Sequence, residues 1–219
     1  MTVVDGTVSV AVPVAVVFAS ALRGDPCLFV DAEGASGLLP TRAWLQDADN
    51  LDEVLVGHCV GPTLDIGCGP GRLAQALALR GLPVLGIDLV PEAVRLSLGR
   101  GVATLLRDVF DPVPGEGRWE TALLADGNIG IGGDPVALLA RVRDLIGRFG
   151  RVVVELAPPG TGVRTRHVRL ETEVGRSEPF PWTLVGTDAI GAVAGAAGLR
   201  LVSEHGFGDR HAAVLEVAR

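Results

Sequence analysis

The stretch from residue 61 to residue 88, GPTLDIGCGPGRLAQALALRGLPVLGID, constrains the fold of this chain more than any other. An apolar run over Thr63–Ile66 predicts a buried strand. Gly67, Gly69 and Gly71 follow it at alternate positions. Glycine permits a sharp turn and lets the backbone come close to a ligand, because no Cβ stands between them.

A helix and a second strand complete this unit. Leu73 and Leu77 stand four residues apart in an alanine-rich segment, which predicts a helix that ends at Gly81. A second apolar run over Pro83–Ile87 is closed by Asp88. A strand, a glycine loop, a helix and a strand with an acid at its tip are the layout of a nucleotide-binding crevice.

The glycine spacing distinguishes between two classes of nucleotide site. Counted from Gly67, the dinucleotide fingerprint needs a third glycine at position 72, where this chain has Arg72. The chain instead reads Asp-x-Gly-x-Gly-x-Gly from Asp65 to Gly71. This pattern resembles motif I of the class I S-adenosylmethionine-dependent methyltransferases, and Asp88 stands where that family keeps the acid that holds the ribose hydroxyls. A Rossmann turn without a ligand does not explain both acids.

The resemblance implies S-adenosyl-L-methionine as the cofactor, with contacts at the carboxyl ends of the strands. In the family, an acid and its neighbour after the third strand (residues 102–106) contact the adenine; the alternative is that this acid only caps a loop. The fourth strand (residues 121–125) leads into a glycine-rich loop at the edge where open α/β sheets bind ligands, although a flexible connector is equally consistent with that loop. The predicted cofactor residues are Asp65, Gly67, Cys68, Gly69, Gly71, Asp88, Leu89, Asp108, Val109, Ala125, Asp126 and Asn128.

The remaining pattern predicts an α/β fold with a Rossmann-like, doubly wound sheet. A helix opens at Asp134-Pro135 and is expected to stop at Gly150, before a fifth strand over residues 152–156. Thr187 is expected to cap the last helix, and strands over residues 199–204 and 212–217 close the chain. The resemblance implies seven strands, the last of them antiparallel. We expect a methyltransferase domain over residues 61–219 and an N-terminal helical cap over residues 1–60.

The N-terminal cap carries the weakest structural signals in the sequence. Residues 14–22 predict a helix, and Asn50 with Glu53 forms a capping-box pattern that opens a short one. In the family such helices often cover the cofactor, so Trp44 is either a lid residue or an ordinary packing residue.

An insert over about residues 158–186 separates the fifth strand from the last helix. Val168 and Leu170 alternate with His167 and Arg169, which predicts a strand or a hairpin. In the family this region usually contacts the substrate. The alternative is that the hairpin only extends the sheet or forms a subunit contact.

Composition excludes several functions. The formal net charge is −7 without a basic run, which argues against a nucleic-acid partner. All 19 basic residues are arginine, so a Schiff-base lysine, a P-loop lysine and the Tyr-Lys pair of short-chain dehydrogenases are absent. Cys27, Cys59 and Cys68 lack CxxC spacing, which favours reduced thiols and no metal site.

The N-terminus predicts neither a signal peptide nor a membrane anchor. The apolar stretch from Val8 to Leu22 is interrupted by Pro13, follows Asp5 rather than a basic segment, and is short for a membrane span. We therefore expect a cytoplasmic protein without a membrane partner.

The chemistry of the implied cofactor asks little of the chain. A sulfonium methyl is already activated, so the protein mainly aligns a nucleophile, and a base is needed only if that nucleophile must lose a proton. His167, His205 and His211 are possible bases by type, but the alternative for each is an ordinary surface or strand histidine, so the catalytic residue is not predicted. The leading hypothesis is a methyltransferase with a small-molecule acceptor. The alternatives are a non-catalytic S-adenosylmethionine- or S-adenosylhomocysteine-binding protein and, more distantly, an NAD-dependent oxidoreductase. The sequence predicts neither the acceptor atom nor the oligomeric state.

Overall fold

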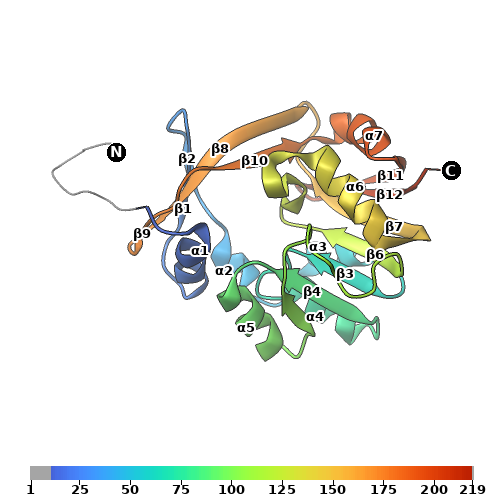
Figure 1. Ribbon diagram of the computed structural model, residues 1–219, viewed down its shortest axis with the longest axis horizontal. Helices are drawn as coiled ribbons and strands as arrows, with labels where there is room; N and C mark the ends of the chain where they lie inside the picture. The colour runs from blue at the N-terminus through green and yellow to red at the C-terminus, as the bar shows by residue number, and fades with distance from the viewer. Residues whose placement is uncertain (1–10, 219) are drawn as a thin grey trace.

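The computed structural model describes residues 11–218 and contains two β-sheets (Figure 1). The larger sheet has seven strands in the order β11-β12-β7-β6-β3-β4-β5. Neighbouring strands from β7 to β5 are parallel, whereas β12 is antiparallel to both β7 and β11. The predicted sheet with an antiparallel last strand is therefore confirmed. Its strands are β3 (Thr63–Ile66), β4 (Val84–Asp88), β5 (Thr104–Leu106), β6 (Trp119–Leu124), β7 (Ile146–Leu156), β11 (Leu199–Phe207) and β12 (Arg210–Val217).

Helices cover both faces of this sheet, because its central strands are apolar on both sides. Leu123 of β6 packs in a cluster with α3 (Asn50–Val56) and α4 (Arg72–Leu79). Its neighbours Ala122 and Leu124 pack in a second cluster with α6 (Pro135–Leu145) and α7 (Thr187–Ala196). Successive side chains of a strand point to opposite faces, so this division is the signature of a doubly wound fold. The helix α5 (Pro91–Gly99) connects β4 to β5.

The second sheet joins two segments that are far apart in the sequence. Its order is β10-β8-β1-β2, with β9 paired to β8. The hairpin predicted in the insert is confirmed as β8 (Val163–Thr172) and β10 (Phe180–Val185), with β9 (Gly175–Arg176) between them in the chain. The other two strands, β1 (Leu28–Asp31) and β2 (Ser36–Leu38), come from the N-terminal segment and were not predicted.

The N-terminal segment is therefore not purely helical. The predicted helix is present as α1 (Val14–Leu22), and α2 (Thr41–Trp44) follows β2. Residues 8–10 of the apolar stretch considered as an anchor lie outside the described residues. Within residues 11–218, no helix combines the length and the apolar character needed to cross a membrane.

Two predicted caps are each wrong by one residue. Asp49, not Asn50, caps α3: its Oδ1 accepts hydrogen bonds from the Leu51 and Asp52 amides at 2.8 Å each, and the Asp52 side chain accepts one from the Asp49 amide. An aspartate and an asparagine in succession are both good caps, so the sequence alone does not choose between them. The N-cap of α7 is Gly186 rather than Thr187, and it makes no side-chain cap.

The helix α6 ends earlier than predicted, at Leu145 instead of Gly150. The Leu145 carbonyl accepts a hydrogen bond from the Gly117 amide, and Ile146 pairs with Trp119 of β6. Pairing with the neighbouring strand therefore draws residues 146–150 into β7.

Candidate functional site

The glycine loop after β3 has one position that is open to a ligand. Gly67, Gly69 and Gly71 have φ angles of 70°, 55° and 87°, in the left-handed region that favours glycine. A Cβ on Gly67 would lie 2.7 Å from Asn128, and one on Gly71 would collide with Ser97. A Cβ on Gly69 would meet no atom within 4 Å. The loop is therefore packed on both sides of Gly69 and free at Gly69 itself.

Asp88 ties the glycine loop to the tip of β4. Its Oδ2 accepts a hydrogen bond from the Gly69 amide at 2.9 Å, and its Oδ1 accepts one from the Val90 amide at 2.8 Å. Burial raises the pKa of Asp88, although the amides of Val90, Gly69 and Leu89 work in the opposite direction. A carboxylate has about four acceptor sites, so Asp88 keeps capacity for a further donor.

Asp65 lies beneath the same loop as a buried acid. It is 2% exposed, and its Oδ2 has no hydrogen-bond partner among the described residues. Burial, reinforced by the negative charge of Asp126, raises the pKa of Asp65 to about 7, and Arg72 opposes this rise. The site thus contains an acid whose charge is only partly compensated by the protein.

Asn128 anchors the glycine loop to the end of β6. It opens the 3₁₀ segment η1 (Asn128–Gly133), and its Nδ2 donates to the carbonyls of Ile66 and Gly67 at 2.9 Å each. Asp126, two residues earlier, has a φ of 52°, which is unusual for a residue other than glycine. Backbone strain of this kind concentrates at functional sites.

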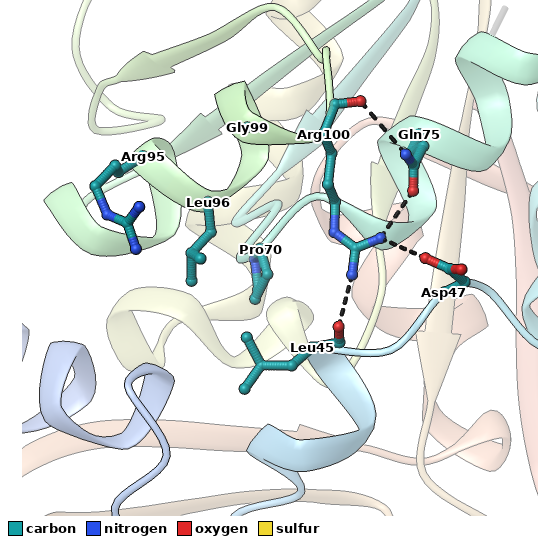
Figure 2. A pocket seen from close by; sticks show the side chains of 8 residues that line it. All are labelled: Leu45, Asp47, Pro70, Gln75, Arg95, Leu96, Gly99 and Arg100. Atoms are coloured by element: carbon teal, nitrogen blue, oxygen red, sulfur yellow. Dashed lines mark hydrogen bonds and ion pairs between the residues drawn. The ribbon is translucent and has the colours of Figure 1, made fainter.

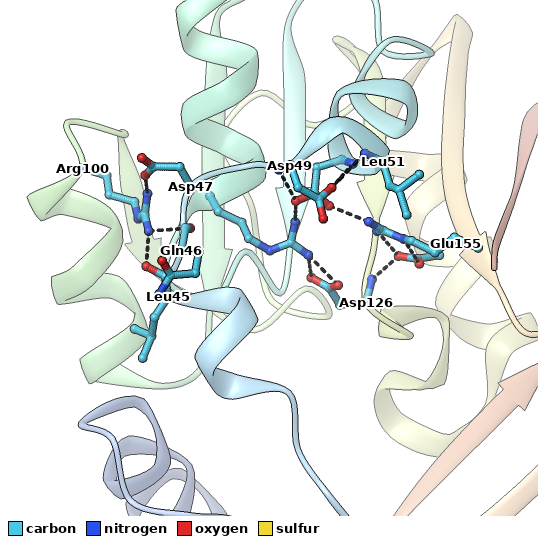
Figure 3. A network of polar contacts seen from close by, with 11 residues as sticks. Leu45, Gln46, Asp47, Asp49, Leu51, Arg100, Asp126 and Glu155 are labelled. Carbon is cyan, nitrogen blue, oxygen red and sulfur yellow. Dashed lines mark hydrogen bonds and ion pairs between the residues drawn. The ribbon is translucent and has the colours of Figure 1, made fainter. Parts of the chain in front are cut away.

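A buried network of charges, which the sequence analysis missed, surrounds Asp126 (Figure 3). Arg72 Nη2 donates to both carboxylate oxygens of Asp126 at 2.7 and 2.8 Å, and Arg72 also forms an ion pair with Asp52. Arg210 bridges Asp52 at 2.6 Å and Glu155 at 2.7 Å. Because Arg72 is only 7% exposed and Asp52 3%, these charges are largely removed from water.

The charges in this network shift the pKa values of its acids. Burial raises the pKa of Asp52, but hydrogen bonds from Arg210 and Arg72 outweigh burial and hold it below its ordinary value. Burial raises the pKa of Asp126, and the Arg72 charge lowers it in part. One feature of the sequence could have indicated this network: Arg72 begins an otherwise uncharged helix, where the helix dipole disfavours a cation unless acids lie nearby.

A third arginine, Arg100, holds the link between α2 and α3 in place. Arg100 donates to the Leu45 and Gln46 carbonyls at 2.7 and 2.8 Å, and to the side chains of Asp47 and Gln75 at 2.9 and 2.8 Å. This link lines a pocket of about 470 Å³ beside the glycine loop (Figure 2). The pocket is lined by Leu45, Asp47, Pro70, Gln75, Arg95, Leu96, Gly99 and Arg100, and so lies next to α4 and α5 rather than over Asp88.

The remaining predicted cofactor residues occupy varied environments. Asp108 Oδ1 accepts a hydrogen bond from the Phe110 amide at 2.9 Å, the local loop contact that was the alternative to an adenine role. Val109 and Ala125 are buried in the apolar core clusters, whereas Leu89 is 57% exposed. Burial raises the pKa of the Cys68 thiol.

Several other side chains considered in the sequence take part in packing. Trp44 stacks on Phe18 of α1 with ring centroids 5.8 Å apart. His205 stacks on His58 with centroids 4.0 Å apart. All three cysteines are buried and unpaired. Within residues 11–218, no group of three or more His, Cys, Asp or Glu side chains is arranged to hold a metal ion.

Known proteins match the glycine-loop unit in sequence. Residues 64–114 match the family model described as "Methyltransferase domain". The chain is 38% identical over 47 residues to the ubiquinone biosynthesis O-methyltransferase of Nitrosomonas europaea, which covers 22% of this chain and 20% of that protein. The enzyme of the same description from Xylella fastidiosa is 49% identical over 39 residues, covering 18% and 16%. The match thus spans a fifth or less of the length of these two relatives.

Solved structures match the whole fold. A SAM-dependent methyltransferase from Bacteroides fragilis in complex with S-adenosyl-L-homocysteine has a TM-score of 0.78 at 18% identity, covering 96% of this chain and 99% of that one. The Burkholderia thailandensis 1,6-didemethyltoxoflavin-N1-methyltransferase has a TM-score of 0.62 at 18% identity, covering 99% and 94%. That structure contains 1,6-didemethyltoxoflavin and S-adenosylhomocysteine. The fold of this chain is that of the S-adenosylmethionine-dependent methyltransferases, as the glycine-loop pattern predicted.

Proposed function

We propose that this chain, which has the class I methyltransferase fold, binds S-adenosyl-L-methionine and transfers its methyl group to a small-molecule acceptor. The observation that carries the proposal is the left-handed glycine loop, which is fastened to Asp88 and has its one open position at Gly69. We take residues 61–219 as the methyltransferase domain and residues 1–60 as its cap.

The residues at the strand ends fit this cofactor. Asp88 retains acceptor capacity for the ribose hydroxyls, and the backbone at Gly69 can approach the ligand closely. Asp65 supplies a buried carboxyl with an oxygen that no protein donor satisfies. S-adenosyl-L-methionine carries two positive groups, its ammonium and its sulfonium, and such charges offset the acids at this edge of the sheet.

The role of the chain in the reaction is positioning. The cofactor supplies an activated methyl group, and the protein aligns an acceptor atom behind it. Asn128 and Asp88 hold the glycine loop rigidly from two sides, which fixes the place of the donor. A general base enters only for an acceptor that must lose a proton. No residue is assigned to that role.

The insert is the part of the chain that we expect to contact the acceptor. The Thr183 hydroxyl of β10 donates to the Gly133 carbonyl of η1 at 2.6 Å, so the insert adjoins the segment that follows Asp126. This contact supports an acceptor role but is equally consistent with a purely structural hairpin. The cytoplasmic location and the absence of a nucleic-acid partner stay predictions.

Calorimetry with S-adenosylhomocysteine and with NAD tests the proposed cofactor. We expect S-adenosylhomocysteine to bind and NAD to show no comparable affinity; the reverse result would overturn the proposal. Incubation with methyl-labelled cofactor and a panel of metabolites then separates the two functions. Labelled product indicates a methyltransferase, whereas binding without turnover on any member favours the alternative of a non-catalytic cofactor-binding protein.

A further inference from the structure

One face of the second sheet carries an aromatic and a charged side chain next to each other. Trp182 of β10 lies directly opposite Arg166 of β8 in the antiparallel register, and Asp31 of β1 lies opposite Val168. Residues that face each other across antiparallel strands, and residues two apart along one strand, share a face. Trp182, Arg166 and Asp31 therefore share one face of the sheet.

This face is divided into an apolar part and a polar part. Phe29, Leu170 and Phe180 belong to the apolar cluster beneath α1, which contains Val17 and Ala21. Among the described residues this cluster reaches Phe180 and does not include Trp182. The apolar cluster on this face thus ends between Phe180 and Trp182. The ring centroids of these two residues lie 6.3 Å apart in an edge-to-face arrangement.

Trp182 connects this polar part to the proposed cofactor edge. A Cβ on Gly130 would lie 2.9 Å from the indole Nε1, and one on Gly127 would lie 4.0 Å from it. Gly127 directly follows Asp126 at the carboxyl end of β6. The indole therefore lies beside the loop where the fold brings donor and acceptor together.

Arg166 is held in place but keeps free donors. Asp31, which is 4% exposed, accepts from the Ala35 amide at 2.7 Å and from Arg166 Nη1 at 3.2 Å. Arg166 Nε and Nη2 donate to no described residue, and the Arg166 side chain is 42% exposed. A guanidinium fixed in this way presents the fork that matches a carboxylate.

The charges around the site favour one orientation of an acceptor. Arg164 lies on the same face as Arg166 and has no carboxylate partner among the described residues. At the cofactor edge, in contrast, Asp126 is paired with Arg72. Arg166 and Arg164 are therefore the charges on this face that attract an anionic end of an acceptor.

We propose that the acceptor is a small planar ring compound with one carboxylate. Arg166 binds this carboxylate, and the ring of the acceptor packs against Trp182. This inference rests on the proposed function. In this inference Arg166 and Trp182 of the insert select the class of acceptor, and Asp31 is a positioning residue for Arg166.

The test compares an acid with its amide of the same shape. Binding of 4-hydroxybenzoate and 4-hydroxybenzamide is measured by ligand-observed NMR and calorimetry in the presence of saturating S-adenosylhomocysteine. We expect the acid to bind about ten- to a hundredfold more tightly than the amide, as charge-assisted hydrogen bonds predict. Arg166→Gln should bring the two affinities level, and Arg166→Lys should restore part of the preference.

Arg169→Gln is the matched control, because Arg169 lies on the same strand but on the opposite face, where it pairs with Glu171 at 2.7 Å. It should leave the preference for the acid unchanged. Equal binding of acid and amide, no binding of the acid, or an unchanged preference in Arg166→Gln would each overturn the inference. Binding of S-adenosylhomocysteine alone is measured first, and its absence would instead contradict the proposed function.

Discussion

Arg72 donates two hydrogen bonds to the carboxylate of Asp126, at 2.7 and 2.8 Å, across 54 positions of the sequence. The same guanidinium pairs with Asp52 at the start of α3. Arg72 is also the first residue of the helix that follows the glycine loop. One side chain therefore connects the N-terminal cap, the glycine loop and the carboxyl end of β6.

Removing this side chain should destabilise the whole fold. In Arg72→Met, Asp126 loses its ion pair with Arg72, and Asp52 keeps only its ion pair with Arg210. Breaking a buried ion pair by removing one partner costs about 3–5 kcal/mol, because the remaining charge is left uncompensated. Urea unfolding followed by circular dichroism should show this loss. Arg95→Met, which removes an exposed arginine of α5 paired only with Glu92, should leave the urea midpoint nearly unchanged; equal midpoints for the two variants would contradict the structural role of Arg72.

The sequence predicted the glycine-loop unit well because its determinants are local. Strand, left-handed glycines, helix and Asp88 follow one another within residues 63–88, and each is specified by its own neighbours. The number of strands and the antiparallel last strand came from the family resemblance, not from any local pattern.

What the sequence did not predict depends on contacts between distant residues. β1 exists as a strand between β2 and β8, and Leu28 of β1 pairs with Glu171 of β8. Short segments like β1 and β2 carry little periodicity of their own, so pairing decides their conformation. The Arg72 network was missed for the same reason, because its acids come from α3 and from the end of β6.

Gly69→Ala should weaken cofactor binding with little effect on the fold. The added Cβ meets no protein atom, so it occupies only the space that we assign to the ligand. The φ of 55° adds backbone strain of about 1–2 kcal/mol for alanine. Gly81→Ala is a matched control, since Gly81 is also left-handed, with a φ of 79°, and also open. Calorimetry should show at least a tenfold loss of S-adenosylhomocysteine affinity for the first variant and none for the second; equal losses would place the ligand elsewhere.

Asp88→Ala should lower the affinity for S-adenosylhomocysteine about ten- to a hundredfold. It removes charge-assisted hydrogen bonds to the ribose that are together worth roughly 1.5–3 kcal/mol, and it also frees the Gly69 amide that Asp88 holds. Asp108→Ala, measured beside it, tests the adenine contact in the same assay. An unchanged affinity for Asp88→Ala would mean that the ribose is held by other residues.

Asp65 should make the stability of the protein fall as the pH rises. Its pKa is 3.8 as a reference and about 7 in the fold, where burial favours the neutral acid. Between these two values the folded protein holds a proton that the unfolded chain has lost. Unfolding therefore releases a proton, and the free energy of unfolding decreases by at most about 1.4 kcal/mol per pH unit from this group. Above pH 7 Asp65 is ionised in both the folded and the unfolded chain, so its contribution to the free energy of unfolding no longer changes with pH.

Asp65→Asn tests this dependence, because asparagine is similar in shape to the neutral acid but does not titrate. Urea unfolding at pH 5, 6, 7 and 8 should show that the variant gains stability relative to the parent protein as the pH rises, with the difference levelling off above pH 7. Asp134→Asn is the control, since Asp134 is the exposed N-cap of α6 and retains its capping geometry as asparagine. A difference between parent and Asp65→Asn that stays constant across this range would show that Asp65 is ionised in the fold throughout, and that Arg72 compensates its charge more fully than the burial of the carboxyl suggests.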